Sequence, residues 1–322
     1  MAKVSVIVPV YNTELYIEKC LESLVNQTLD DIEIVLINDG STDESLSIMT
    51  KYKEKYADKI LLISQENAGQ GVARNLGISK CSGEYIGFVD SDDYVNLSMY
   101  ETMWEKANEE NLDLVECRYQ YIDEKNKELK QYGDVRPYRD CNDMFIDPLV
   151  SPWNKLVKAD ILKRINSVFA EGVIYEDTAF YLKIIPHIKK SGFVDQALVY
   201  HINRGTSTMN ANKNKRVGDI FKVLKGIIDY YDKNNYRETY KNELEYFCVK
   251  ILLCSSMVRI SKVTDKKLCQ IFLNTTFEMI NDYFPEYKGN PYMQQGKKNL
   301  YMKLISYKSA KVLLPLFRRI GE

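Results

Sequence analysis

The sequence has no paired cysteines and no glycine-rich nucleotide loop. Its seven cysteines are odd in number and form no Cys-x-x-Cys pair. No disulfide framework or cysteine-based zinc site is therefore expected, and the thiols are predicted to be reduced, as in a cytosolic protein. Gly-x-Gly-x-x-Gly does not follow the first predicted strand, which argues against a dinucleotide dehydrogenase. The pattern Gly-x-x-x-x-Gly-Lys-Ser/Thr is also missing, which argues against a P-loop NTPase.

Long apolar runs are absent as well. No stretch reaches the ~18 consecutive apolar residues that a membrane-spanning helix needs. The N-terminal residues enter a strand-like pattern at once, so no signal peptide is expected.

Charge is unevenly distributed along the chain. The formal net charge is −1, but residues 1–205 carry 23 Lys and Arg against 34 Asp and Glu, whereas residues 206–322 carry 21 against 11. An acidic front and a basic back favour two modules with different partners.

The stretch from Tyr85 to Asp93 combines an apolar run with three carboxylates. Tyr85 to Val89 is typical of a buried strand, and Asp90, Asp92 and Asp93 follow it directly. A buried strand cannot hold three acids, so they are expected at its carboxyl end, where open α/β sheets bind ligands. Clustered carboxylates suit Mg²⁺ or Mn²⁺. A solvated acidic turn is the alternative, and this stretch alone leaves both open.

Strand and helix patterns alternate through the first part of the chain. This rhythm predicts an α/β fold with right-handed crossovers and a parallel sheet that is covered on both faces. Farther along, apolar residues recur at helical spacing, which predicts a helical module. The expected strands lie at 4–10, 32–37, 60–63, 85–89, 112–121 and 193–202, and the late helices at 217–232, 238–262 and 265–283.

The ends of the first, second and fourth strands are expected to converge on one edge of the sheet. Asp39 would then lie beside the acidic stretch, where its carboxylate could accept a hydrogen bond from a base N–H. Arg74 could pair with Asp39 or approach a phosphate. The alternatives are an Asp in a tight turn and a surface arginine on a helix.

Several motifs together resemble the family 2 glycosyltransferases, which are inverting enzymes with the GT-A fold. They occur in order through the first two thirds of the chain, and the resemblance covers about residues 1–210. The motifs are Val4–Asn12, Glu33–Asp43, Asn67–Gly69, Ala73–Asn75 with Gly77, Phe88–Asp93, Pro152–Leu156 and Glu176–Asp177.

The resemblance implies two domains. Residues 1–209 would form the GT-A catalytic domain, a Rossmann-like and mostly parallel sheet with helices on both faces. Residues 210–322 would form a basic, C-terminal α-helical module.

The resemblance also implies a donor site. Pro9, Tyr11 and Asp39 would hold the uracil of a UDP-sugar, and Asp90 would contact the ribose or a metal-bound water. Arg74 is assigned to the same donor site.

The remaining site residues concern the metal, the base and the acceptor. The resemblance implies that Asp92, with Asp90, would bind Mn²⁺ or Mg²⁺, which would stabilise the leaving diphosphate as a Lewis acid. Asp177 would be the general base, with Glu176 as the second candidate. His201 would complete the metal or diphosphate site, although a lone histidine is often structural. Trp153 would lie on the acceptor side.

The predicted function is the metal-dependent, inverting transfer of a hexose or N-acetylhexosamine from a UDP-sugar to a polysaccharide or lipid-linked glycan. A catalytically silent nucleotide- or glycan-binding module is one alternative. A phosphatase with an aspartate nucleophile is another, although Tyr94 stands where such enzymes have Thr or Val. Nucleic acid is not an expected partner. The sequence leaves open whether the chain forms a homo-oligomer.

The end of the chain is basic and aromatic. Such a segment favours reversible docking on an anionic membrane, which places the protein in the cytoplasm on the inner face of the cell membrane. A last helix that packs on its neighbours with a solvated basic face is the alternative. Between Tyr287 and Gly321 there is no acidic residue, and the basic ones are Lys288, Lys297, Lys298, Lys303, Lys308, Lys311, Arg318 and Arg319.

Overall fold

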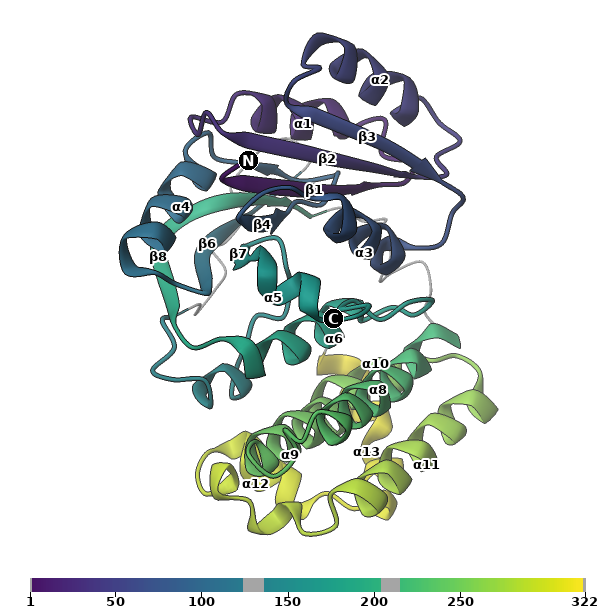
Figure 1. The fold of residues 1–322 in the computed structure, drawn as a ribbon. Coiled ribbons are helices and arrows are strands. Elements are labelled where there is room, and N and C mark those ends of the chain that lie inside the picture. The colour runs from purple at the N-terminus through teal and green to yellow at the C-terminus, as the bar shows by residue number, and fades with distance from the viewer. Residues whose placement is uncertain (1, 124–135, 204–214, 321–322) are drawn as a thin grey trace. The chain divides into compact units, whose positions relative to one another are not determined.

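An eight-stranded mixed sheet organises the first two thirds of the chain (Figure 1). The computed structural model describes residues 2–123, 136–203 and 215–320, without the side chains of residues 319 and 320. The chain forms two compact units. The first unit comprises Met1–Cys141, Leu149–Gly172 and Glu176–Arg204, and the second unit comprises Asn142–Pro148, Val173–Tyr175 and Gly205–Glu322.

The strand order of the sheet is β3-β2-β1-β4-β7-β6-β8-β5. Pairing is parallel from β3 to β4 and between β6 and β8, and it is antiparallel on both sides of β7 and between β5 and β8. The α/β class and the mostly parallel character of the first strands are confirmed. The strands are β1 (Val4–Val10), β2 (Ile32–Asp39), β3 (Ile60–Gln65), β4 (Tyr85–Phe88), β5 (Tyr94–Val95), β6 (Leu114–Ile122), β7 (Lys155–Lys158) and β8 (Ser191–Ile202).

Helices cover both faces of the sheet because successive strand side chains point to opposite faces. Val4, Val6 and Val8 of β1 face a core cluster shared with the helices α1 and α4. Ile7 faces the other side and packs on α3, where a Cβ added to Gly77 would come within 2.5 Å of it. The helices of this unit are α1 (Ile17–Val25), α2 (Ser45–Lys55), α3 (Gln70–Lys80), α4 (Met99–Glu110), α5 (Ala159–Arg164) and α6 (Glu176–Ile184).

The second unit is helical, as the sequence pattern predicts. Its core includes α10 and α11, and Leu314 of α13 packs against that core. Within the described residues, none of the helices combines the length and apolar character that crossing a membrane requires. The helices are α8 (Asp219–Lys233), α9 (Lys241–Lys250), α10 (Ser256–Ser261), α11 (Lys266–Tyr283), α12 (Lys297–Leu304) and α13 (Tyr307–Ile320), and a π-helical turn, η4 (Ile251–Ser255), joins α9 to α10.

The sequence prediction is less accurate at two boundaries. The single helix expected at 238–262 is interrupted by η4, and helix is found to continue through the tail as α12 and α13. The predicted domain boundary between residues 209 and 210 lies outside the described residues, so it stays a prediction.

Candidate active site

Polar side chains connect the loops that follow β1, β2 and β4. Asn12 Oδ1 accepts a hydrogen bond from the backbone N–H of Thr42 at 2.8 Å. The Thr13 hydroxyl donates to the Ser91 hydroxyl at 3.1 Å, and the Thr13 N–H donates to Ser45 Oγ at 2.9 Å. The expected convergence of these three strand ends on one edge of the sheet is therefore confirmed.

Asp39 is buried at the end of β2 and is held by its neighbours. Its Oδ1 accepts hydrogen bonds from Gln65 Nε2 at 2.6 Å and from the N–H of Ala68 at 2.9 Å, and its Oδ2 accepts one from the N–H of Gly69 at 2.9 Å. Of the two possibilities for Arg74, pairing with Asp39 is not found, because Asp39 accepts from these other groups and the guanidinium of Arg74 has other partners.

Arg74 is the centre of a buried ion cluster. Its side chain is 1% exposed, so it is not a surface arginine. Its Nη2 lies 2.7 Å from Asp90 Oδ1, and its Nη1 lies 3.1 Å from Glu176 Oε1 and 2.8 Å from Asp177 Oδ1. Burial alone would lower the pKa of Arg74, but the three carboxylates raise it above its usual value. One guanidinium therefore joins the acidic loop after β4 to the start of α6.

A close backbone approach places Arg74 within reach of α6. A Cβ added to Gly71, one turn before Arg74 in α3, would lie 2.6 Å from the carbonyl oxygen of Ala170. The segment that leads into α6 therefore packs directly on the first turn of α3. α6 begins after Tyr175, whose φ of 71° lies in the left-handed region.

We expect Gly71→Ala to destabilise the protein by about 1–3 kcal/mol, because the new methyl group overlaps a backbone oxygen that cannot turn away. Gly226→Ala in α8 is the matched control. Apart from the backbone of its own helix and its chain neighbours, nothing in the described residues lies within 4 Å of its added Cβ, and alanine favours a helix interior by up to ~1 kcal/mol. The measurement is the free energy of unfolding of both variants. Equal effects of the two substitutions would contradict the packing argument.

Asp177 is the better placed of the two candidate bases. Its side chain is 28% exposed, whereas that of Glu176 is 12% exposed. Burial raises the pKa of Asp177 to about 7, Arg74 opposes this shift, and the charges of Glu176 and Asp90 add to it. An aspartate with a pKa near neutrality can accept a proton efficiently at physiological pH.

The acidic loop after β4 forms a potential cation site. Asp90, Asp92 and Asp93 each offer a carboxylate oxygen, and these oxygens lie within 4.8 Å of one another. Asp90 Oδ1 already accepts from Arg74 and from Gln70 Nε2. A set of carboxylate oxygens suits a hard divalent ion such as Mg²⁺ or Mn²⁺.

Asp93 is the residue whose role the sequence analysis missed. It is 1% exposed, and its Oδ1 accepts a hydrogen bond from the N–H of Ile202 at 2.9 Å. Its Oδ2 lies 2.6 Å from His201 Nδ1. Burial alone would lower the pKa of His201, but the hydrogen bond that it donates to Asp93 and the negative charge of Asp93 raise it. The antiparallel pairing of Tyr94 with Tyr200 brings the two side chains together. In the sequence, the only indication of this role is that Asp93 is the third acidic residue of the stretch from Tyr85 to Asp93.

The contact with Asp93 orients the imidazole of His201. A hydrogen bond from Nδ1–H to the carboxylate leaves Nε2 as the nitrogen available to a ligand, as in metal sites where a carboxylate supports a histidine. Arg204 and Ser207, which follow His201 in the sequence, lie outside the described residues.

The remaining predicted site residues differ in accessibility. Tyr11 is 49% exposed after β1, whereas Pro9 is buried within that strand. Trp153 is 5% exposed and stacks on His201 with ring centroids 5.4 Å apart, while Tyr119 meets its edge. Trp153 is thus mainly a packing residue behind His201, and its role on the acceptor side stays a prediction.

Comparison with known proteins places the chain in a family. The model of the family described as "Glycosyl transferase family 2" matches residues 5–165. The uncharacterized glycosyltransferase EpsJ of Bacillus subtilis is 33% identical over 266 residues, which are 76% of this chain and 74% of EpsJ. The poly(ribitol-phosphate) beta-glucosyltransferase of Bacillus spizizenii is 34% identical over 65% of this chain and 33% of its own length.

A solved structure supports the fold. Residues 1–349 of S. aureus TarS, in complex with UDP-GlcNAc, have a TM-score of 0.78 with this chain at 22% identity, and the match covers 99% of this chain and 92% of that one. These matches favour a glycosyltransferase over the phosphatase alternative. The chain belongs to glycosyl transferase family 2 and is a glycosyltransferase with the GT-A fold.

Proposed function

We propose that this glycosyltransferase transfers a sugar from a UDP-sugar to a polysaccharide or lipid-linked glycan in one inverting, metal-dependent displacement. The observation that carries the proposal is the ion cluster in which Arg74 joins the acidic loop after β4 to Asp177. A cation site for the diphosphate and a base for the acceptor then lie on opposite sides of one guanidinium.

The donor would lie along the carboxyl ends of β1, β2 and β4. Tyr11 is exposed enough for its ring to stack on a uracil, and Asp39 is held rigidly so that it could accept a hydrogen bond from the base. The structure of TarS with UDP-GlcNAc supports a UDP-sugar as the donor. Pro9, which is buried in β1, would support the loop that binds the uracil.

The cation site would hold the diphosphate. Asp92 and Asp90 would provide oxygens, and His201 Nε2 would complete the ligand set from the opposite strand. A bound Mn²⁺ or Mg²⁺ would supply Lewis-acid stabilisation of the charge that develops on the departing UDP. Asp93 would keep His201 in the tautomer that this ligand set needs.

Asp177 would remove the proton of the attacking hydroxyl group. Its Oδ1 is held by Arg74, and Oδ2 accepts no hydrogen bond within the described part of the chain. The attack would occur on the face of the sugar opposite the departing UDP, so the anomeric configuration would invert. The anomeric carbon would pass through an oxocarbenium-like state, as in glycoside hydrolysis.

Asp92→Asn tests the cation site, because it keeps the size of the side chain but removes one negative charge. In the wild type, UDP with Mn²⁺ is expected to raise the thermal unfolding midpoint, since a ligand of the folded state stabilises it. We expect Asp92→Asn to abolish this increase. Asp160→Asn, at a side chain that is 72% exposed, is the control and should retain it. Unchanged protection of Asp92→Asn would contradict the metal role.

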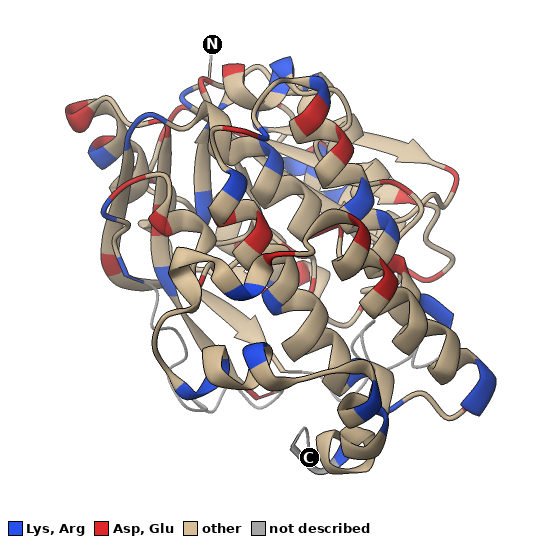
Figure 2. Cartoon of the chain, turned by 90° about the horizontal axis from the view of Figure 1, so that it is seen from below, with Lys and Arg blue, Asp and Glu red and all other residues tan. Residues whose placement is uncertain are grey.

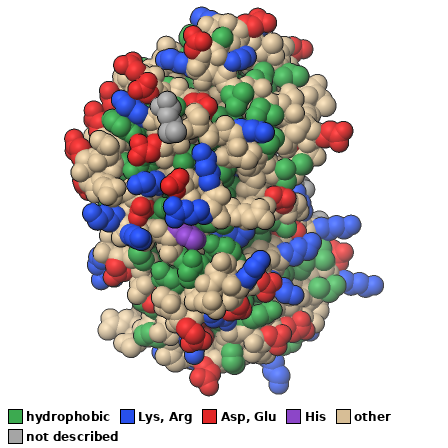
Figure 3. Space-filling model, viewed as in Figure 1, with side chains coloured by type: hydrophobic (Ala, Val, Ile, Leu, Met, Phe, Trp, Pro, Cys, Tyr) green, Lys and Arg blue, Asp and Glu red, His purple; other side chains and the backbone are tan. Residues whose placement is uncertain are grey.

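We also propose that the second unit docks on an anionic membrane, which would place the enzyme in the cytoplasm on the inner face of the cell membrane. Each helix from α8 to α13 carries Lys or Arg. Figure 2 shows the Lys and Arg residues of the chain in blue, and Figure 3 shows basic side chains beside apolar ones on one face of the molecule. Val312 is 76% exposed and Leu316 is 53% exposed, one turn apart on α13. Lys308 and Lys311 are exposed on the same helix. A lipid-linked acceptor would make such docking useful.

A further inference from the structure

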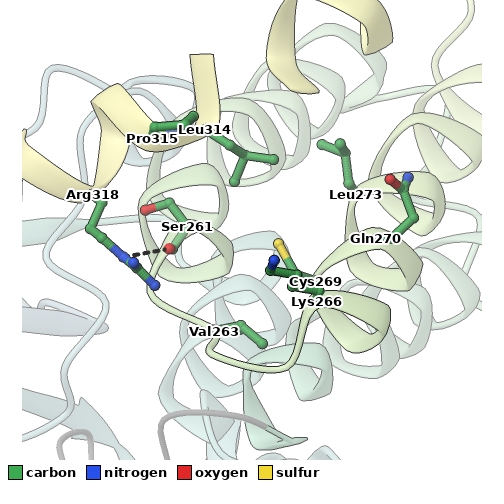
Figure 4. Close-up of a pocket in the computed structure, with 9 residues that line it drawn as sticks. All are labelled: Ser261, Val263, Lys266, Cys269, Gln270, Leu273, Leu314, Pro315 and Arg318. Atoms are coloured by element: carbon green, nitrogen blue, oxygen red, sulfur yellow. Dashed lines mark hydrogen bonds between the residues drawn. The ribbon is translucent and has the colours of Figure 1, made fainter. Parts of the chain in front are cut away.

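A pocket in the second unit lies far along the chain from the residues of the active site. Its volume is about 530 Å³, within the range of ~300–1,000 Å³ for small-molecule sites. It is lined by the end of α10, the first half of α11 and the last half of α13 (Figure 4).

The walls of the pocket are largely apolar. Leu273 of α11 and Leu314 of α13 lie on different sides of it, and Val263 lines it from the loop between α10 and α11 (Figure 4). Leu314 and Cys269 pack against the core cluster that contains Val263. The pocket therefore borders the hydrophobic core, which favours an apolar group as its occupant.

Two cations border the apolar walls. Lys266 comes from the first turn of α11 and Arg318 from the last turns of α13, and no acidic residue in the described part of the chain lines the pocket. Within the described residues, neither side chain forms an ion pair. Arg318 Nε donates to the carbonyl oxygen of Ser261 at 3.2 Å, at the end of α10. This bond uses one of the five N–H groups of the guanidinium and leaves its two terminal nitrogens for a ligand.

The pattern of charge and apolar surface determines the class of ligand. Lys and Arg suit a phosphate, and the guanidinium can bind two phosphate oxygens at once. A free phosphate would not use the apolar walls, whereas an acyl chain would. The same helix that forms one wall, α13, exposes Val312 and Leu316 to solvent. A membrane in contact with α13 would therefore bring lipids close to the helix that forms this wall.

We propose that this pocket binds one anionic phospholipid, with the phosphate at Lys266 and Arg318 and the start of an acyl chain against Leu273 and Leu314. The proposal rests on the membrane docking of the second unit proposed above. It adds one specific lipid-binding site to the general attraction between the basic surface and an anionic membrane.

Cys269 provides a direct measure of occupancy. It lines the pocket and is half-buried, and Cys254, also half-buried, lies in the same unit outside the pocket. The full chain is treated with a thiol reagent, and modification is located by mass spectrometry. Dihexanoyl phosphatidylglycerol, present as monomers, is expected to slow the modification of Cys269 but not that of Cys254. Inorganic phosphate and dihexanoyl phosphatidylcholine are the comparison ligands, and both should protect at least about tenfold less well.

Variants distinguish lipid binding in the pocket from charge attraction at the rest of the surface. Lys266→Gln with Arg318→Gln should raise the lipid concentration needed for protection at least about tenfold, because two charged hydrogen-bonding groups are lost. Arg318→Lys, which keeps the charge, should retain much of the protection. Lys308→Gln with Lys311→Gln removes the same number of charges outside the pocket and should leave protection of Cys269 unchanged. An unchanged thermal midpoint shows that each variant is folded.

Vesicle co-sedimentation distinguishes failure of this inference from failure of membrane docking. Salt-sensitive binding to phosphatidylglycerol vesicles, but not to phosphatidylcholine vesicles, is expected for the wild type, and Lys308→Gln with Lys311→Gln should weaken it. Vesicle binding without protection of Cys269 by the short-chain lipid would overturn the pocket and leave docking intact. Equal protection by inorganic phosphate would reduce the site to an anion site. Absence of both vesicle binding and protection would overturn both proposals.

Discussion

Asp177→Asn is expected to lower the turnover of sugar transfer by at least ~10²-fold, the lower end of the contribution of a positioned acid or base. UDP affinity should remain nearly unchanged. The amide oxygen of Asn can still accept a hydrogen bond from Arg74 at the position of Oδ1, so the ion cluster keeps its geometry. The variant loses only the group that takes the proton. Steady-state turnover and UDP binding, measured on the same preparations, separate the two effects.

The pH dependence gives a second measure of the same role. The pKa of Asp177 is raised to about 7, so the fraction able to accept a proton grows as the pH rises through that value. Wild-type turnover should therefore rise with pH around neutrality, and the residual turnover of Asp177→Asn should lack that rise.

Glu176→Gln is the matched control for this experiment. Glu176 is adjacent in sequence and contacts the same nitrogen of Arg74, but its side chain is less exposed. We expect a smaller loss of turnover. A larger loss of turnover in Glu176→Gln would identify Glu176 as the general base instead of Asp177. Normal turnover in both variants would show that another residue is the base.

Arg74→Met is expected to destabilise the first unit by about 3–5 kcal/mol, the cost of leaving buried charges without their partner. Three carboxylates now neutralised by one guanidinium would then repel each other in a site with little water. Sugar transfer should be lost too, because Arg74 would no longer hold Asp90 of the cation site and the proposed general base Asp177 in place.

The destabilisation should depend on pH. Without Arg74, burial and mutual repulsion raise the pKa values of the carboxylates in the folded state above those in the unfolded chain. The folded state then keeps protons that the unfolded state releases, so stability falls as the pH rises above about 4. The deficit of Arg74→Met relative to the wild type should therefore be larger at pH 8 than at pH 5, as measured by urea unfolding.

Arg164→Met controls for the loss of an arginine as such. Arg164 pairs with Asp160 at 3.6 Å, and both side chains are 72% exposed. Exposed pairs contribute at most ~1 kcal/mol, so little change is expected. If Arg74→Met were no less stable at pH 8 than Arg164→Met, the role of Arg74 in neutralising the cluster would be wrong.

The order of most elements, though not the strands β5 and β7, and the location of the site follow from the sequence itself. The apolar run before Asp90 is readable as a buried strand because a strand covered on both faces needs apolar residues at almost every position. Acids that follow such a run must then emerge at its end. The same local logic places Tyr11 and Asp39 at strand ends, and the helical spacing after residue 215 predicts the second unit.

The sequence could not assign partners within the site. Arg74 is 102 residues from Glu176, and Asp93 is 108 residues from His201. Such pairs depend on how α3 packs on the segment before α6 and on the pairing of β5 with β8, which no local pattern encodes. For this reason the sequence could offer the pairing of Arg74 with Asp39 only as one of two possibilities, and it is not the one found.

The sequence by itself therefore determined the fold class, the family resemblance and the residue types at the site, because these depend on periodicity and on motifs that are contiguous in the chain. Only the tertiary structure decided that Arg74 is buried between Asp90 and Asp177 and that Asp93 supports His201. Only the tertiary structure places Lys266 and Arg318 at one apolar pocket. The physical reason is that burial and pairing of charges depend on distances through space, and packing between elements sets those distances.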